Sequence, residues 1–468
     1  MDPYDSASTT TGLIKPETVY DRLELPIIFL IVLVALLVRT IHLDGMEFKG
    51  DEAFNLMKAR ELAELQSFPL RSGTSSTGIP EPPIFMYLLS IPLVFSDDAV
   101  FVTGYIALIN VFGVVLCFVL VRRFVSRRAA IIAAALYAVS PWQVLFSRKI
   151  WTQNLLPPFI LLFLLLLFES VYRKRPNLII FALGLLAIIL QLHLSAIYLV
   201  PFTFLFLIWH RQNISLRYIC IGIALALLLF VPYIIDIIYS DFEAIRTAFD
   251  QASKPFVFRP EGIKLPLQLV TTNGFEYSLG TSYEDFTRTV PRLAALDYLM
   301  MLLCVIGLGI ALFNRSSAVR ALALYTFISL VFFVLLNKTE LYAHYFNSLL
   351  PVLLILCALP VAAIFSKGTS LWKWLSAFGF TAILVYHLSF TISFLGFINR
   401  TDCIWGDYGP PYRARVESVR GAIRDIESSG DHLDFDTIHE SSRFCVKWDQ
   451  LATQYVIEML EDNHNSIR

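Results

Sequence analysis

Charged residues are scarce in this sequence. Asp, Glu, Lys and Arg make up only 16% of its 468 residues, whereas a soluble domain has roughly 25%. The 21 Gly, 22 Pro and 6 Cys do not have the abundance of a collagenous chain or a disulfide-rich miniprotein. A formal net charge of −1 provides no overall basic field for nucleic acid. The composition therefore excludes a soluble multidomain protein and gives no indication of nucleic-acid binding.

Motifs for nucleotides and metals are missing as well. The chain has no G-x-G-x-x-G or P-loop pattern, no C-x-x-C pair and no His-rich spacing. Only Cys403 and Cys445 fall outside the apolar runs described next. A disulfide between them is chemically permitted in an oxidising compartment, and the sequence leaves it open.

Long apolar runs separate the charges. At 1.5 Å per residue, about 20 apolar residues cross the roughly 30 Å hydrocarbon core of a bilayer. The block from Asn177 to Trp209 is too long for one span, so we place a tight turn at His193. The sequence thus predicts an all-α polytopic membrane protein with about eleven transmembrane helices, at 23–43, 100–121, 129–146, 155–172, 177–192, 194–209, 216–239, 294–313, 318–336, 346–366 and 374–397.

Basic residues are distributed unequally between the two sides of these spans. If residues 1–22 are cytoplasmic, five inner loops hold 13 basic residues, whereas the three short outer loops hold only Arg148, Lys149 and Lys338. This asymmetry follows the positive-inside rule. It predicts that the C-terminus lies on the exterior, periplasmic or lumenal, side.

Three exterior segments are too long to be simple connections. They are residues 44–99, 240–293 and 398–468, and we expect chemistry on their side of the membrane. The first should contain a helix over 50–66 and a short apolar helix over 84–95, which either spans or lies at the interface. The last should form a small domain of two helices with a possible short strand between them: one helix carries Val416, Val419, Ile423 and Ile426 at helical spacing, and the other runs from Trp448 to Leu460.

Asp51 and Glu52 begin the first of these exterior helices. Neighbouring positions on a helix point about 100° apart, so the two carboxylates cannot act as a dyad on one site. Asp51 could simply cap the helix, since carboxylates are favoured at helix starts. Alternatively one carboxylate acts on a substrate and the other supports it.

A resemblance favours the catalytic alternative. Gly50-Asp51-Glu52-Ala53 after the first span, Ala59-Arg60, and the double proline at 82–83 opening a short apolar helix together resemble membrane glycosyltransferases of the GT-C class. The similarity is to family 39, the protein O-mannosyltransferase and aminoarabinose transferase-like branch. The loop from Phe146 to Asn154 is also similar, and the resemblance extends over most of the chain.

The resemblance implies transfer of a sugar from a polyprenyl-phosphate donor to a protein, lipid or glycan acceptor on the non-cytoplasmic side. It implies Asp51 as general base, Glu52 as a weaker candidate for acceptor positioning, and no required metal. Such a donor needs a cavity at the membrane interface and cations for its phosphate.

Further candidates follow on the same exterior side. Arg148 and Lys149 could bind the donor phosphate, although basic residues at helix ends also reach the interface without other roles. His344 and Tyr345 could bind near the phosphate, with an interfacial aromatic belt as the alternative.

Sugar contacts are the third expectation. Gln153 and Asn154 could bind sugar hydroxyls, although many relatives carry an acid near the second position. His193 is either a substrate contact or an ordinary turn residue.

A transporter or lipid-linked sugar flippase without transferase activity is the competing class. Such proteins carry ionisable or helix-breaking features near the bilayer midplane. Here the polar groups gather at the outer ends of the spans.

Overall fold

Helices at each predicted span confirm the all-α membrane architecture. The computed structural model describes residues 19–465 except 337, 430–433, 443–444 and 446–448. By length and composition, eight helical segments of this described part could cross a membrane. They contain α1 (Val19–Thr40), α4 (Ala99–Phe124), α7 (Leu156–Tyr172), α10 (Leu216–Tyr239), α15 (Ala294–Leu312), α16 (Ser317–Val331), α17 (Leu350–Lys367) and α18 (Ser370–Arg400).

The other three predicted spans are shorter helices. They are α5 (Arg127–Val139), α8 (Leu178–Leu192) and α9 (Leu199–Trp209). The predicted turn at His193 is confirmed, because α8 ends at Leu192 and His193 has an extended backbone. The total number of membrane crossings stays a prediction.

Two predicted spans are interrupted. The run 129–146 breaks at Ser140 into α5 and α6 (Pro141–Phe146), because a residue before proline is disfavoured in helical geometry. The run 346–366 begins as a 3₁₀ helix, η7 (Ala343–Ser348), and α17 starts only at Leu350. Both breaks lie beside the cavities described below.

Helices α17 and α10 differ in their surroundings. Helix α17 is largely buried and packs against α5, α15 and α18, so it forms the centre of the bundle. Helix α10 is apolar but mostly exposed, and it packs mainly on α8. An apolar surface of this length is stable only when lipid covers it. The chain is therefore an integral, multi-pass membrane protein.

The first exterior segment forms η1 (Leu43–Gly45), α2 (Gly50–Ala63) and α3 (Ile84–Leu93). Helix α2 confirms the predicted helix but ends earlier, before Leu65, whose φ is 58°. Helix α3 has 10 residues, about 15 Å of length, which is too short to cross a bilayer. It packs against α2, α4 and α8.

Short helices make up the middle exterior segment and the remaining connections. In the middle segment they are α11 (Glu243–Ser253), α12 (Glu261–Leu269), α13 (Phe275–Leu279), η5 (Gly280–Ser282) and α14 (Tyr283–Thr287). The connections and helix ends contain η2 (Thr152–Leu155), η3 (Leu194–Ala196), η4 (Arg211–Asn213) and the π-helical turn η6 (Phe332–Leu336).

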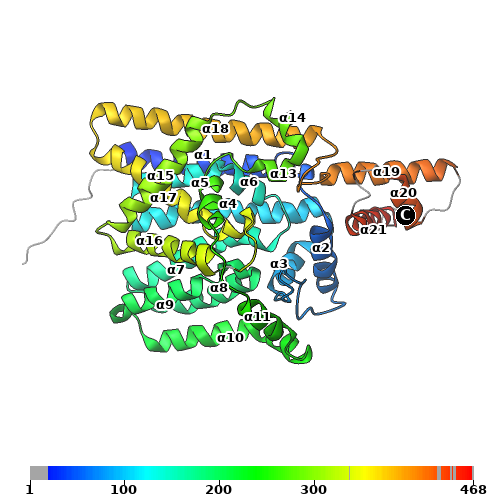
Figure 1. The fold of residues 1–468 in the computed structure, drawn as a ribbon, viewed down its shortest axis with the longest axis horizontal. Helices are drawn as coiled ribbons and strands as arrows, with labels where there is room; N and C mark the ends of the chain where they lie inside the picture. The colour runs from blue at the N-terminus through cyan, green and yellow to red at the C-terminus, as the bar shows by residue number, and fades with distance from the viewer. Residues whose placement is uncertain (1–18, 337, 430–433, 443–444, 446–448, 466–468) are drawn as a thin grey trace, which may run out of the picture.

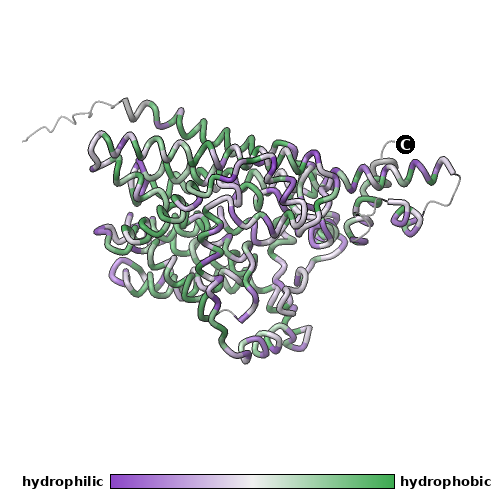
Figure 2. Tube along the Cα trace, turned by 45° about the horizontal axis from the view of Figure 1, so that its top comes forward, coloured by the Kyte–Doolittle hydropathy of each residue, from purple (hydrophilic) through white to green (hydrophobic). Residues whose placement is uncertain are grey.

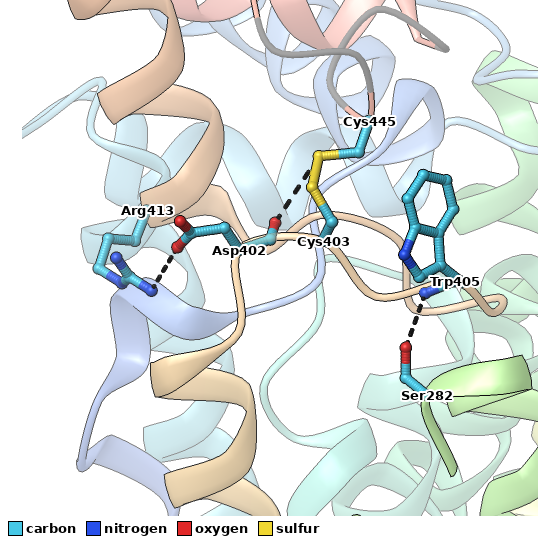
Figure 3. Close-up of a disulfide and its surroundings, with 6 residues drawn as sticks. All are labelled: Ser282, Asp402, Cys403, Trp405, Arg413 and Cys445. Carbon is cyan, nitrogen blue, oxygen red and sulfur yellow. Dashed lines mark hydrogen bonds and ion pairs between the residues drawn. A yellow bond between two sulfur atoms is a disulfide. The ribbon is translucent and has the colours of Figure 1, made fainter. Parts of the chain in front are cut away.

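The C-terminal segment has three helices, α19 (Tyr412–Ser429), α20 (Phe435–Ser441) and α21 (Gln450–Asn465). Between the two expected helices, the described residues form α20 and no strand, and Asp434 caps the start of α20 by accepting from the Thr437 N–H; residues 430–433, 443–444 and 446–448 of this stretch lie outside the described residues. Trp448, the expected start of the last helix, lies outside the described residues. Cys403 and Cys445 form a disulfide, and close by Trp405 donates its backbone N–H to Ser282 of η5 (Figure 3).

The segments predicted to be exterior gather at one end of the bundle. Helices α2, α3 and α19 to α21 lie together at the right of Figure 1. In Figure 2 the spans are predominantly hydrophobic, and hydrophilic residues concentrate in the connections and the C-terminal segment. This end is where the candidate residues meet.

Candidate functional site

Two cavities of similar size adjoin at this end of the bundle. The polar cavity has a volume of about 370 Å³ and the apolar cavity about 390 Å³. Trp151, Tyr277, Tyr342 and His344 line both. Ligands in the two cavities would therefore be separated only by these side chains.

The polar cavity contains most of the predicted substrate residues. Its walls come from α2, the loop 73–81, η2, the turn after α8, α13 and η7. The predicted residues that line it are Asp51, Gln153, His193, His344 and Tyr345. Residues more than 290 positions apart thus meet around one space.

Asp51 and Glu52 have opposite environments, as their helical offset requires. Asp51 is exposed and lines the polar cavity. Glu52 is 0% exposed, and its Oε2 accepts the Lys49 backbone N–H at 2.8 Å. Burial raises the pKa of Glu52 to about 7, against the opposing charge of Lys149. Glu52 therefore supports the start of α2 and does not face the acceptor, which corrects its predicted role.

Lys149 belongs to a buried group of ions beside the apolar cavity. Its Nζ lies 2.6 Å from Glu47 Oε1 and 3.5 Å from Glu52 Oε1. The same Nζ lies 3.1 Å from the centre of the Trp151 ring, a cation–π contact. Lys149 and Glu47 both line the apolar cavity. Lys149 thus provides an ammonium group where the two cavities meet.

Lys49 binds the same carboxylate oxygen from the other side. Its Nζ lies 2.6 Å from Glu47 Oε1 and donates to the Asp407 carbonyl at 2.6 Å. Burial disfavours its charge, but Glu47 and Asp407 outweigh burial and raise the pKa of Lys49. Lys49 therefore stays protonated and shares Glu47 with Lys149.

Arg148 has a different position from its neighbour. It is 3% exposed, and its guanidinium donates to the carbonyls of Arg39, Ile41 and His42. These bonds hold the end of α1 to the loop after α6. Arg148 donates to backbone carbonyls and lines neither cavity, which corrects its predicted role as a phosphate ligand.

Gln153 and Asn154 are also separated by the fold. Gln153 lines the polar cavity. Asn154 is 1% exposed, donates to the Lys149 carbonyl and accepts from Asn347, each at 3.0 Å. Asn154 therefore fixes the loop internally, and its predicted sugar contact is corrected.

Burial favours the uncharged forms of the two histidines of the polar cavity. Burial lowers the pKa of His193 to about 4, and burial with the nearby His193 and Lys149 charges lowers that of His344 well below its usual value. His193 Nδ1 also accepts the Ser195 N–H at 3.2 Å, so the turn role and a cavity position coexist. Neither can attract a phosphate by charge, but both can form hydrogen bonds.

Aromatic rings hold His344 in place. Its ring centre lies 4.8 Å from that of Trp151 and 4.6 Å from that of Tyr345. The Tyr345 hydroxyl forms a 3.3 Å hydrogen bond with Ser76 Oγ. Tyr345 therefore joins η7 to the loop over the polar cavity.

The sequence analysis missed Glu81, which also lines the polar cavity. Burial, followed by the charge of Asp51, raises the pKa of Glu81 to about 7. Its position directly before the double proline was visible in the sequence, but no helical spacing connected it to Asp51. Glu47, Tyr277, Tyr342 and Asp407 were missed for the same reason.

The described residues contain no group of three or more His, Cys, Asp or Glu side chains arranged to hold a metal ion. Of the carboxylates at the cavities, Glu47 and Asp407 pair with lysines, Glu276 pairs with Arg292, and Asp51 is exposed.

Residues 80–235 match a family described as dolichyl-phosphate-mannose-protein mannosyltransferase. No curated protein sequence matches the chain. The matched family residues include α3 and the loop that carries Lys149 and Gln153.

The fold is similar to that of several solved structures. ArnT from Cupriavidus metallidurans in the apo state gives a TM-score of 0.57 at 13% identity over 86% of this chain and 80% of ArnT. The same enzyme bound to undecaprenyl phosphate gives 0.54 at 13% identity, over 92% and 76%.

The oligosaccharyltransferase of Archaeoglobus fulgidus, in complex with Zn and sulfate, gives 0.54 at 15% identity over 85% of this chain. The present chain spans only 55% of that enzyme. Together, the family match and the fold confirm the predicted resemblance to GT-C membrane glycosyltransferases.

Proposed function

We propose that the protein transfers a sugar from a polyprenyl-phosphate donor to an acceptor, with Asp51 as the general base. One observation carries this proposal: a polar cavity bearing a free-standing carboxylate adjoins an apolar cavity that ends at a lysine. A lipid-linked sugar is divided in the same way: its hydrocarbon chain matches the apolar cavity, its phosphate the lysine, and its polar sugar the polar cavity.

The acceptor enters the polar cavity and gives its proton to Asp51. The deprotonated acceptor atom attacks the anomeric carbon, and the bond from that carbon to the phosphate oxygen breaks. Polyprenyl phosphate leaves with the electron pair of that bond. General-base assistance of this type contributes on the order of 100- to 10,000-fold in rate.

Lys149 stabilises the charge that develops on the leaving phosphate. In the present arrangement its ammonium binds Glu47 Oε1 at 2.6 Å. Glu47 therefore competes with the phosphate and sets the affinity for the carrier. His344, neutral and beside Lys149, supplies a hydrogen bond in the same place.

The apolar cavity accommodates the part of the carrier next to the phosphate. Its walls include Leu145, Phe146, Leu265 and Leu269. The solved ArnT structure with undecaprenyl phosphate supports this class of carrier. The remainder of the chain stays in the bilayer.

The distribution of basic loops supports an exterior location for the site. The short loops that follow α4, α7, α9, α15 and α17 carry 13 basic residues, against three in the short loops at the α2 end, and they lie at the ends of spans remote from α2. The acceptor is therefore a periplasmic or lumenal protein, lipid or glycan.

Transfer by the purified full chain in lipid nanodiscs tests the proposal. The donors are undecaprenyl-phosphate pentoses and hexoses with a radiolabelled sugar, incubated with a membrane and secreted-protein extract as acceptor source. We expect labelled product with the wild type and at least a 100-fold lower rate with Asp51→Asn.

Binding of undecaprenyl phosphate is measured in parallel, and Asp51→Asn should retain it. Label that crosses a liposome membrane without forming product would instead identify a flippase. Equal rates for the wild type and Asp51→Asn would refute the assignment of the base.

A further inference from the structure

Helix α2, which carries Asp51, begins without an acceptor of its own. The first N–H groups of a helix have no partner within it, and Ser, Thr, Asp or Asn commonly supplies one from the preceding position. Here that position is Lys49, whose ammonium has no acceptor atom. Glu52 binds the Lys49 N–H, and the next N–H must find an oxygen elsewhere.

That oxygen comes from the other end of the chain. Asp449 Oδ2 accepts the Gly50 N–H at 2.5 Å, across 399 positions of sequence. Asp449 also precedes α21 and caps it, because its Oδ1 accepts the Ala452 N–H at 3.1 Å. One carboxylate thus caps two helices, each through a different oxygen.

Further bonds hold the C-terminal segment to the same short stretch. Arg415 is 1% exposed and donates from Nε to the Phe48 carbonyl at 2.8 Å. Its Nη2 lies 4.0 Å from Asp449 Oδ2. The Tyr412 N–H and the Tyr408 hydroxyl donate to the carbonyls of Met46 and Gly45. The chain leading into α2 is therefore fixed by the C-terminal segment.

The contact is also closely packed. A Cβ on Gly50 would lie 3.2 Å from Asp449 Oδ1, which is tighter than ordinary contact. The glycine allows the carboxylate to reach the helix start directly. Asp51 is the next residue, so any displacement of the start of α2 also displaces the Asp51 side chain, which lines the polar cavity.

We propose that Asp449 is a positioning residue for the transferase site: by capping α2 and α21 together, it fixes where the Asp51 carboxylate stands. This inference rests on the function proposed above. A misplacement of about 1 Å at a reacting group can lower a rate by on the order of 100-fold. The C-terminal segment thus acts on the reaction without touching the substrate.

The test compares Asp449→Ala and Asp449→Asn with Asp434→Asn in the full chain. Asp434 caps α20 in the same segment, by accepting the Thr437 N–H at 2.8 Å, and is a matched control. We expect Asp449→Ala to lower kcat about tenfold with the donor KM within about twofold, and Asp434→Asn to leave both unchanged. Asp449→Asn retains one acceptor oxygen and should recover part of the loss.

Hydrogen exchange measured by mass spectrometry provides a readout independent of activity. In Asp449→Ala, amides of residues 49–56 should exchange faster, whereas Asp434→Asn should leave them unchanged. If Asp449→Ala does not fold, Gly50→Ala replaces it in this measurement. Gly50→Ala crowds Asp449 without removing its charge and should increase the exchange of the same amides.

The exchange result also separates this inference from the transferase proposal. If exchange is faster in Asp449→Ala but the wild type transfers no sugar, the proposed function is refuted and the contact between Asp449 and Gly50 still stands. Unchanged exchange at 49–56 in Asp449→Ala, or an unchanged kcat in an active enzyme, would overturn the role of Asp449.

Discussion

The polar and apolar cavities differ in chemistry although they share a wall. The polar cavity presents Asp51 and Glu81, and the apolar cavity presents leucine and phenylalanine side chains together with Lys149 and the carboxylates of Glu47, Glu276 and Asp407. A single stretch of chain lines both, with Lys149 on the apolar side and Gln153 on the polar side. The comparison shows that the position of a side chain relative to this wall, more than its residue type, decides which part of a substrate it can reach.

Neighbouring residues show the same effect. Asp51 faces the polar cavity and Glu52 is buried, while Lys149 lines the apolar cavity and Arg148 binds the backbone. Each of these two pairs therefore supplies one residue to the cavities and one to the scaffold, whereas His344 and Tyr345 both line the polar cavity. Mutations that act on one cavity alone can test this division.

After Asp51→Asn, Lys149→Ala should have the largest effect. It removes the ammonium from the apolar cavity, so affinity for undecaprenyl phosphate should fall at least about tenfold. It also leaves Glu47, whose side chain is 8% exposed, with fewer counter-charges, so the free energy of unfolding should fall by up to about 3 kcal/mol. Binding to nanodisc-embedded protein and thermal unfolding measure the two effects.

Lys58→Ala is the matched control, because Lys58 forms an exposed ion pair with Glu61 on α2. Glu47→Gln should have the opposite sign and raise carrier affinity, since it removes the competing carboxylate. Unchanged carrier affinity in both Lys149→Ala and Glu47→Gln would show that the carrier phosphate does not bind beside Lys149.

Leu265→Trp should affect only the apolar cavity. The added volume fills space between α12 and the shared wall. A change of one methylene in an apolar pocket already alters binding measurably, so this larger change should raise the donor KM about tenfold. Steady-state kinetics at fixed acceptor measure it. Ile263→Trp, on an exposed position of the same helix, is the control. A fall in kcat with an unchanged KM would contradict the assignment of this cavity to the lipid.

Glu81→Gln should have a smaller effect, on stability against pH. Because burial and Asp51 raise the pKa of Glu81 from 4.5 to about 7, its contribution is complete below 4.5 and is lost as pH rises through about 7. Tm of the wild type should therefore fall over this range by about 2 °C more than Tm of Glu81→Gln. Calorimetry at several pH values measures it, with Glu64→Gln as an exposed control. Parallel curves for wild type and Glu81→Gln would show that folding does not raise the pKa of Glu81.

Chelation should have the smallest effect. We predict that EDTA changes the transfer rate by less than about twofold, because Lys149 supplies the positive charge that a metal would otherwise provide. Measurement before and after dialysis against EDTA checks this, with added Mg²⁺ or Mn²⁺ as the restoring control. Loss of turnover that a divalent ion restores would contradict the prediction.

Much of the fold was predictable from local patterns. Helix α10 agrees with the predicted 216–239 because its ends follow an uninterrupted apolar run. The turn at His193 followed from the length of its apolar block, and the start of α2 from Gly50-Asp51-Glu52. Asp51, Gln153 and His344 were selected as candidates, and the structure places them on one cavity.

The remaining features depend on segments that meet only in three dimensions. Glu81 and Asp407 belong to no local pattern that relates them to Asp51 or Lys149. The contact of Asp449 with Gly50 spans 399 positions. Even Arg148 and Lys149, adjacent and equally charged, could be distinguished only by what surrounds them.

Hydrophobicity and charge along the chain determined the membrane-embedded helical bundle and the end at which polar residues collect, because transfer of apolar runs into lipid depends on each run by itself. Tertiary structure decided which carboxylate faces open space, which lysine reaches the apolar cavity and what caps α2. Those outcomes depend on packing between distant helices, because the contacts that neighbouring residues make with other segments fix the direction of each side chain.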